Sequence, residues 1–504
     1  MLWEPFRSAD RNGRKMCVTG ARRRPNRRLA SGGTAGRLRS RLSLPGRCNS
    51  IVSGVSQCRL RRPWHYGNPA WLRTCTMSMS ETTNSGTKGW QVSLSGLQFA
   101  VFSTRNFVFF LAVLAMNFTL FRPSPVDLLY ITAFLFTLFY LTLSPRLGVT
   151  RRAVYLSLAV GAWAVSYMLA SAPHVGEENV LFELLAKTFS IAIGVIGAFV
   201  SMSWNRRHFE TFMRVYVVSC SIASVLGIIG FFLQNELLTW DGRAKGLIDD
   251  PNMYGSFLIP AVIFCAYLLT RTRANKLFFL GAMLLILLGI FFSLSRIALV
   301  AALACLLAYI FFQNRRDPRR LLLILLGLVV SAVLLPGIIS IASPEFSERF
   351  LERLTLAQPY DLGEEGRYGR YLLVLPMIMQ DPIGVGVLQL EKIFPEPIHN
   401  IWLSSFVNYG WGGGIAWLCL AFGSAVVSIR NYRRTRSEIP VVLLASLVGI
   451  VMCATLHEGE HWRHMWLFFG LVWGLNVFCL GAAAKQKAAR PQPVSRQGQM
   501  APER

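Results

Sequence analysis

The stretch LHEGEHWRH, residues 456–464, contains two histidines at the spacing of a metal site. His457 and His461 fit the H-E-x-x-H pattern of zinc proteases, in which both histidines lie on one face of a helix. Gly459 inside the motif weakens a helix, and the only acidic residue downstream of His461 is Glu503, near the C-terminus. A downstream carboxylate therefore cannot complete a zinc site, whereas an upstream ligand remains an alternative. We interpret the motif as a turn that lines a pocket, and we expect no bound metal.

Basic side chains in alternate loops form a second group that could do chemistry. Guanidinium groups bind phosphate oxygens through paired hydrogen bonds and need no metal for this. A histidine beside them could take a proton from an attacking hydroxyl, because histidine titrates near neutral pH. The candidates, in chain order, are Arg243, Lys245, Arg296, Arg367, Arg370, His399 and Arg463. If these residues converge, they form a cationic pocket suited to a lipid-linked diphosphate.

Several candidates also have a purely structural explanation. Arg296 could extend its side chain from a helix end to the membrane surface. Arg243 could pair with the nearby Asp241, and His399 could be a histidine that only makes structural hydrogen bonds. The DDPN segment, residues 249–252, resembles a helix cap with proline at the first helical position, which we favour over a catalytic role.

Long apolar segments must position these residues. The 504-residue chain is 53% hydrophobic and only 15% charged, which is too apolar for an ordinary soluble protein. From about residue 98, apolar runs long enough to cross a bilayer as helices alternate with short polar loops. We predict an all-α membrane protein with about twelve transmembrane helices, the tenth broken or kinked near Gly410. The predicted spans lie near residues 106–121, 126–143, 153–171, 180–203, 211–233, 253–270, 276–293, 297–313, 321–342, 400–429, 438–455 and 465–483.

Charged residues divide the loops into two alternating sets. The basic loops are SPRLGVTRR, NRRHFETFMR, RTRANK, QNRRDPRR and RNYRRTR, and the alternate loops, such as APHVGEEN and LHEGEHWRH, carry acids and histidines. The excess of basic residues on cytoplasmic loops predicts that both termini are cytoplasmic and that the alternate loops lie outside. One outer connection, residues 343–399 between spans nine and ten, is long enough to be functional, and it begins with the amphipathic stretch SPEFSERFLERLTLA.

The ends of the chain differ from its apolar middle. The net charge is +26, and residues 1–76 hold seventeen basic residues against two acidic ones. We predict that this Arg-rich extension is disordered and lies upstream of the true start, in preference to a transit peptide or a nucleic-acid-binding tail. We expect no nucleic-acid partner. A cytoplasmic segment (77–97), a membrane domain (98–483) and a cytoplasmic tail (484–504) follow.

Four segments resemble, in their order along the chain, the O-antigen ligase / O-antigen polymerase superfamily. They are GLIDDPNMYGSFL, FFSLSRIALVAAL, GRYGRYLLVLPMIMQDPIGVG and IHNIWLSSFVNYGWGGG, and the resemblance covers roughly residues 100–480. It implies a GT-C-like, multi-pass glycosyltransferase of the bacterial inner (cytoplasmic) membrane that uses glycan linked to undecaprenyl diphosphate at the periplasmic face. The histidine-rich HEGEH motif and residues 1–76 depart from the pattern of the superfamily.

The resemblance also implies roles for the matching residues. His399 would be the histidine of the large periplasmic loop that accepts or orients the proton of the acceptor hydroxyl. The arginines implied to stabilise the departing diphosphate in place of a metal are Arg243, Arg296 and Arg367. The further candidates for the pocket are Lys245, Arg370 and Arg463. The implied reaction is a one-step displacement at the anomeric carbon, with inversion and without a cofactor.

Alternative functions remain open from the sequence. We favour an O-antigen ligase with lipid A core as acceptor over a polymerase that joins O-antigen or exopolysaccharide repeat units onto a second glycan. A protein glycosyltransferase is a smaller possibility. A transporter of polyprenyl-linked lipids would share the spans and the cationic pocket, but it should show internal repeats with paired broken helices. An intramembrane zinc protease is the third class. Membrane lipids are expected partners in every case.

Overall fold

The computed structural model describes residues 94–480, apart from residues 121–123, 145–149, 272–274 and 395–396 and most of 325–365. The predictions made for residues 1–76, for most of the span at 321–342, for the amphipathic stretch at 343–357 and for the tail at 484–504 lie outside the described residues.

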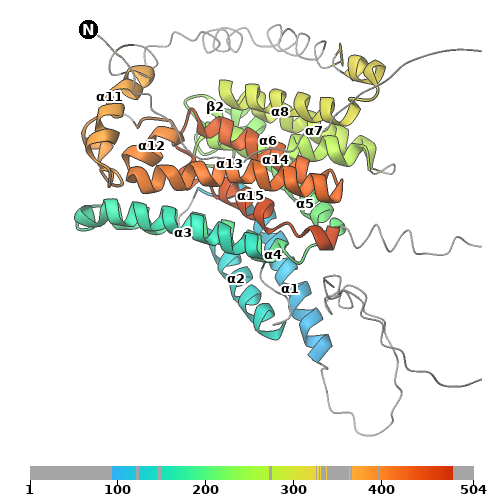
Figure 1. Ribbon diagram of the computed structural model, residues 1–504. Coiled ribbons are helices and arrows are strands. Elements are labelled where there is room, and N and C mark those ends of the chain that lie inside the picture. Colours follow the sequence, from blue (N-terminus) through green and yellow to red (C-terminus); the bar gives the residue numbers. More distant parts are fainter. Residues whose placement is uncertain are drawn as a thin grey trace, which may run out of the picture. The chain divides into compact units, whose positions relative to one another are not determined.

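The described chain is almost entirely helical (Figure 1). The long helices are α1 (Leu94–Leu114), α2 (Pro125–Leu143), α3 (Arg151–Ser171), α4 (Val180–Ser201), α5 (Arg206–Leu233), α6 (Pro251–Leu269), α7 (Lys276–Phe292), α8 (Arg296–Asn314), α11 (Arg367–Gln380), α13 (Gly410–Thr435), α14 (Ile439–Ala454) and α15 (Arg463–Gly474). The short ones are η2 (Ala115–Asn117), η3 (Ala172–His174), η4 (Leu390–Lys392), α12 (Ile401–Val407) and η5 (Gly459–His461). Within the described ranges, β1 (Thr239–Trp240) and β2 (Arg243–Ala244) pair antiparallel.

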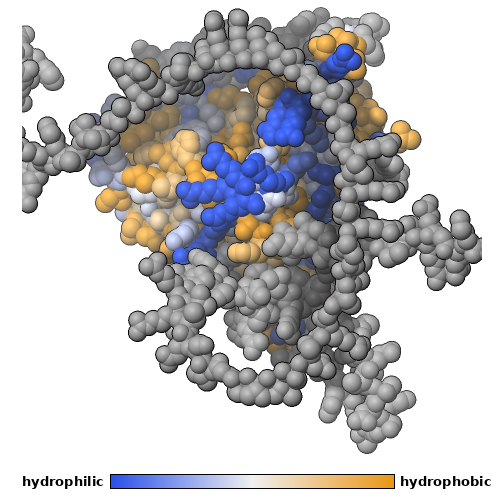
Figure 2. Space-filling view, turned by 45° about the vertical axis from the view of Figure 1, so that its right-hand side comes forward, coloured by the Kyte–Doolittle hydropathy of each residue, from blue (hydrophilic) through white to orange (hydrophobic). Residues whose placement is uncertain are grey.

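Eight of the described helices are long and apolar enough to cross a membrane, namely α1 to α6, α8 and α13. The helices α7 and α14 are apolar but shorter. Large apolar side chains stand exposed on these helices, as a lipid-facing surface requires, and Leu233 and Leu277 are 73% and 85% exposed. In Figure 2 hydrophobic residues cover most of the visible described surface, while hydrophilic ones gather in compact patches. These features confirm an all-α membrane protein, and the number of twelve spans stays a prediction.

The first helix differs from the predicted span at 106–121. It begins at Leu94 and carries Arg105 in its interior rather than at its start. The Arg105 side chain is fully buried, donates to Ser203 Oγ at 2.8 Å and lies over the ring of Tyr140 at 4.6 Å. A charged residue is tolerated inside this helix because its guanidinium has polar and aromatic partners. The prediction treated the charge of Arg105 as the boundary of the apolar run and therefore placed the start of the helix too far along the sequence.

The predicted break near Gly410 is present. The helix α12 ends at Val407 and α13 begins at Gly410, whose φ of +67° is in the left-handed region that favours glycine. The turn that follows α11 packs against this break, because Val385 N–H donates to the Val407 carbonyl and Trp411 N–H donates to the Pro382 carbonyl, both at 2.9 Å. A Cβ on Gly410 would overlap that turn. The break therefore joins α12 and α13 to the loop that carries His399.

Loops predicted to share one side of the membrane contact one another. Among the acidic and histidine-containing loops, Glu177 accepts hydrogen bonds from Lys392 at 2.6 Å and from Gln389 at 2.9 Å. Among the basic loops, Arg271 pairs with Glu438 at 2.6 Å. Loops of the same set thus contact one another, as expected if successive connections alternate between the two sides of the membrane. Which side is cytoplasmic stays a prediction.

Close packing of α4 against α15 positions the residues between α14 and α15. A Cβ on Gly194 would lie 2.8 Å from the carbonyl oxygen of Trp466, and one on Gly197 would lie 3.0 Å from Leu467 Cδ1. Small residues allow two membrane helices to approach this closely. The chain just before α15 is therefore held against α4, and this chain contains the HEGEH motif.

Candidate active site

The HEGEH loop, residues 456–462, forms a turn rather than an α-helix. Only Gly459–His461 is helical, as the single 3₁₀ turn η5, and Glu458 before it has φ −87° and ψ 88°. His457 and His461 therefore do not share the α-helical face that a zinc protease uses, and the prediction of a turn is confirmed. Among the residues that the structure describes, no group of three or more His, Cys, Asp or Glu side chains is placed to hold a metal ion.

His399 lies against this loop. Its backbone has a φ of +54°, an uncommon conformation for a residue other than glycine, and it directly precedes the N-cap of α12. The cap residue Asn400 accepts hydrogen bonds from the N–H groups of Trp402 and Leu403 at 2.9 and 3.2 Å. The His399 and His457 rings meet edge to face, with centroids 5.7 Å apart. The cap and the backbone conformation together fix the direction of the His399 side chain.

The helix α11 supports His399 from a second direction. Arg370 is 1% exposed and donates from Nη1 to the carbonyl of Pro397 at 2.9 Å. The hydroxyl of Tyr371 donates to the His399 carbonyl at 3.4 Å. Arg370 thus binds the backbone just before His399, whereas Arg367 lies one turn earlier, at the start of α11.

Arg243 is held where three helices meet. Its Nε donates to the carbonyl of Ser293 at 2.9 Å and its Nη2 donates to Asn252 Oδ1 at 2.8 Å. Ser293 follows α7, and Arg296, the partly buried first residue of α8, comes three positions later. Arg243 and Arg296 therefore belong to the same junction of α6, α7 and α8.

The DDPN segment builds one side of this junction. Asp250 caps α6 and accepts hydrogen bonds from the N–H groups of Asn252 and Met253, both at 2.8 Å, and Pro251 is the first helical residue. The prediction of a cap is confirmed. Because Asn252 also accepts from Arg243, the cap contributes directly to the position of that guanidinium.

The candidate residues come together around His457. Burial lowers the pKa of His457 well below its usual range, and the charges of His399, Arg367 and Arg243 lower it further. Charges shift a pKa in this way only over short distances, so all three groups lie near the same ring. The structure thus brings together the predicted base and two of the predicted diphosphate-binding arginines, from loops that are far apart in the sequence.

Two further candidates have partners of a different kind. Arg463 is 9% exposed and pairs with Asp127, at the start of α2, at 2.9 Å. It therefore makes a buried ion pair, and its place in the pocket stays a prediction. Burial lowers the pKa of Lys245, and the carboxylates of Asp249 and Asp250 oppose this shift, which places the Lys245 ammonium close to two acids.

Sequence reasoning missed two functional candidates. Lys187 lies inside the apolar run of α4, and a charge within a membrane helix signals a functional or paired group. It pairs with Glu460 of the HEGEH loop at 2.8 Å. Burial next to Glu460 raises the pKa of Glu458 to about 7, so that this carboxyl can hold a proton at neutral pH. The charge of Lys187 inside an apolar run was a usable signal in the sequence, whereas no sequence pattern indicated that the pKa of Glu458 would be raised.

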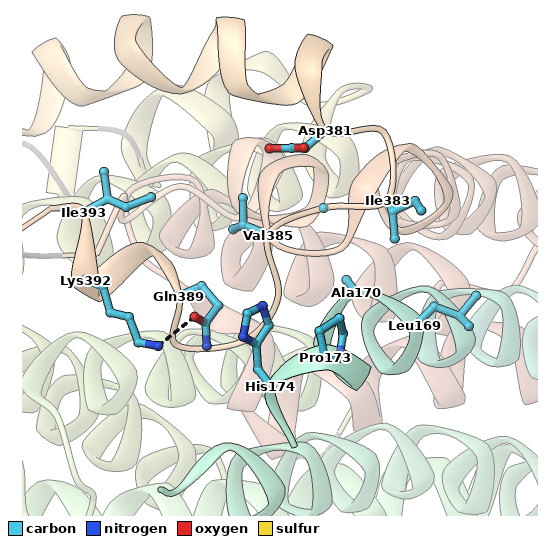
Figure 3. A pocket seen from close by; sticks show the side chains of 11 residues that line it. Leu169, Ala170, Pro173, His174, Asp381, Ile383, Val385, Gln389, Lys392 and Ile393 are labelled. Atoms are coloured by element: carbon cyan, nitrogen blue, oxygen red, sulfur yellow. Dashed lines mark hydrogen bonds between the residues drawn. The ribbon is translucent and has the colours of Figure 1, made fainter. Parts of the chain in front are cut away.

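An open groove of about 510 Å³ lies between the end of α3 and the turn after α11 (Figure 3). Leu169, Ile383 and Val385 give it apolar walls, and His174 and Lys392 stand at its polar edge. The predicted site residues are not among its lining residues. The groove is therefore not the centre of the candidate site.

Residues 281–418 match the family model described as O-antigen ligase. This match supports, over this part of the chain, the resemblance to the O-antigen ligase/polymerase superfamily. The matched segment runs from α7 into α13 and contains Arg296, Arg367 and His399, while Arg243 and His457 lie outside it. A comparison with curated proteins finds no match. Together with the long apolar helices, the match supports a multi-pass membrane protein of the O-antigen ligase/polymerase type.

Proposed function

We propose that this O-antigen ligase-like protein transfers a glycan from undecaprenyl diphosphate to a hydroxyl of lipid A core, at the periplasmic face of the bacterial inner membrane. The observation that carries the proposal is the convergence of His399, Arg243 and Arg367 around the half-buried ring of His457. A histidine beside two guanidinium groups combines a proton acceptor with a binding site for a diphosphate.

The reaction that this arrangement supports is a single displacement. The acceptor oxygen forms a bond to the anomeric carbon while the bond from that carbon to the diphosphate oxygen breaks. The hydroxyl proton passes to His399, and the bonding electrons leave with undecaprenyl diphosphate. Arg243, Arg296 and Arg367 stabilise the negative charge that develops on the leaving group. The proposal includes inversion at the anomeric carbon, because the nucleophile enters opposite the leaving group.

A lipid-linked donor suits the position of these residues. Arg296 begins the apolar helix α8, and Arg243 binds Asn252 and Ser293 at the ends of α6 and α7, so a phosphate bound there would have its polyprenyl chain beside a hydrophobic surface. Glycan donors outside the cytoplasm cannot be nucleotide sugars, which are confined to the cytoplasm. Both considerations favour undecaprenyl diphosphate as the carrier.

The decisive experiment uses the purified full-length chain in lipid nanodiscs. Undecaprenyl-diphosphate-linked glycan and lipid A core are added with and without EDTA, and the products are separated on a gel. Transfer of glycan onto lipid A core in the presence of EDTA supports the proposal. A ladder that grows on undecaprenyl diphosphate identifies a polymerase instead. Activity that EDTA abolishes and zinc restores overturns the metal-independent mechanism.

Matched variants connect the reaction to the site. Arg243→Gln should lower kcat/KM about 10²- to 10³-fold, the usual effect of removing one group that stabilises a transition-state charge. The control is Arg207→Gln, which removes an exposed arginine at the start of α5, and it should retain full activity. Equal activity of all three proteins would separate Arg243 from the chemistry. Retention of the anomeric configuration in the product would exclude the single displacement.

A further inference from the structure

A buried carboxylate fixes the HEGEH loop. Glu460 is 1% exposed and accepts hydrogen bonds from three side chains on other elements. Its partners are Lys187 Nζ and Ser404 Oγ, both at 2.8 Å, and the hydroxyl of Tyr409. The indole N–H of Trp466 donates to the Glu460 carbonyl at 2.7 Å. The loop is thereby tied at once to α4, to α12, to the residue before α13 and to α15.

The same contacts fix His457 relative to His399. His457 precedes the Glu460 anchor by three residues, and His399 precedes α12, which supplies the Ser404 partner of that anchor. The indole N–H of Trp402 in α12 adds a hydrogen bond at 3.1 Å to Thr455 Oγ1, just before the loop. The edge-to-face contact of the two imidazoles, at 5.7 Å, is therefore held from both sides.

The surroundings of this histidine pair limit its charge. Four neighbouring groups oppose a positive charge on the His457 ring, namely Arg243, Arg367, His399 and His461. Two neighbouring groups that repel each other's charge are protonated in two separate steps, which belong to the pair and not to either group alone. The pair therefore has room for one additional proton, and in the resting state His457 is an uncharged hydrogen-bond acceptor.

We propose that His457 is a second catalytic residue of the site, which shares with His399 the proton released by the acceptor hydroxyl. This assignment rests on the proposed function. The carbon–oxygen bond to the acceptor forms, the bond to the diphosphate breaks, and the proton stays within the histidine pair until it passes to water. His457 lowers the barrier because an uncharged ring beside His399 can accept a hydrogen bond from this proton and take up part of its charge. At 5.7 Å between ring centres, one hydroxyl can contact both rings.

The test replaces His457 by glutamine, which can accept a hydrogen bond but cannot take a proton at neutral pH. We expect kcat for glycan transfer to fall about 10²-fold, the usual contribution of a general base, with the KM of the donor unchanged. His208→Gln, at the start of α5 in one of the basic loops, is the matched control and should behave like the wild type. Added imidazole should restore transfer by His457→Gly, because it can occupy the space of the missing ring.

Different outcomes separate this assignment from the proposed function. A kcat of His457→Gln within twofold of the wild-type value overturns the catalytic role. A lower unfolding temperature, lost binding of undecaprenyl diphosphate and no rescue by imidazole would show that His457 only supports the structure, and this also overturns the role. Absence of transfer by the wild-type protein overturns the proposed function and, with it, the assignment. Rescue by imidazole without a change in donor binding establishes the catalytic role of His457.

Discussion

Replacement of Lys187 by methionine tests the buried anchor directly, because it removes one charge of an ion pair and keeps most of the side-chain volume. Lys187 and Glu460 are 2.8 Å apart, and their side chains are 12% and 1% exposed. Loss of one partner of a buried pair costs about 3 to 5 kcal/mol of unfolding free energy, since the other charge stays buried without compensation. Ser404 and Tyr409 still donate to Glu460, which places the expected cost at about 3 kcal/mol.

The assay is thermal unfolding in nanodiscs, followed by tryptophan fluorescence. A cost of about 3 kcal/mol corresponds to a decrease in Tm of about 4 °C for a domain of about 390 residues. The double variant Lys187→Met/Glu460→Gln should lose about 1 to 3 kcal/mol less than the sum of the two single variants, because it removes both charges. Lys276→Met, at the exposed start of α7, is the control and should stay within about 0.5 kcal/mol of the wild-type stability.

Two results would refute this reasoning. A decrease of less than about 1 kcal/mol for Lys187→Met would mean that the pair contributes no more than an exposed salt bridge. Additive losses in the double variant would mean that Lys187 and Glu460 act independently. In either case the Glu460 anchor would not hold His457 in place, and the argument for a histidine pair would lose its structural basis.

Three further variants test other parts of the structure. The pKa of Glu458 is raised from 4.5 to about 7, so the folded protein binds more protons than the unfolded chain between these pH values. The free energy of unfolding should therefore fall as pH rises from about 4.5 to 7. Thermal unfolding of Glu458→Gln should show a flatter pH dependence over this range. Gly410→Ala should lower Tm, because alanine in the left-handed region costs about 1 to 2 kcal/mol even before its overlap with the neighbouring turn is counted. The control Gly281→Ala should leave Tm unchanged, because Gly281 has open space around it. Arg463→Met should destabilise the protein by about 3 kcal/mol, because it removes the ion-pair partner of Asp127. The KM of the donor should stay at the wild-type value. A raised KM would show that Arg463 contributes to donor binding.

Local features of this protein follow from the sequence. Apolar runs of bilayer length predict the helices, and the DDPN and glycine-rich segments predict the cap of α6 and the break before α13. These features depend on neighbours within one turn of helix, so a short window of sequence contains the interactions that decide them. The start of α1 was missed because two partners of Arg105, Ser203 and Tyr140, lie on other segments that are distant in the sequence.

The composition of the site depends on tertiary contacts. The sequence singles out Arg243, Arg367 and His399 by residue type and loop, but nothing in it shows that they surround His457. The HEGEH motif resembles a zinc site in the sequence, and in the fold its first histidine meets His399 while its last glutamate binds Lys187.

An apolar helix in a lipid environment can pack against several neighbours at similar free energy, and periodicity does not choose among them. The choice falls to buried polar pairs and to close contacts of small residues, such as Gly194 against Trp466, which join segments far apart in the chain. The sequence by itself therefore determines the helices, the sidedness pattern of the loops and the chemical types available. Only the tertiary structure decides which histidines and arginines share one site, because only there are long-range polar contacts made.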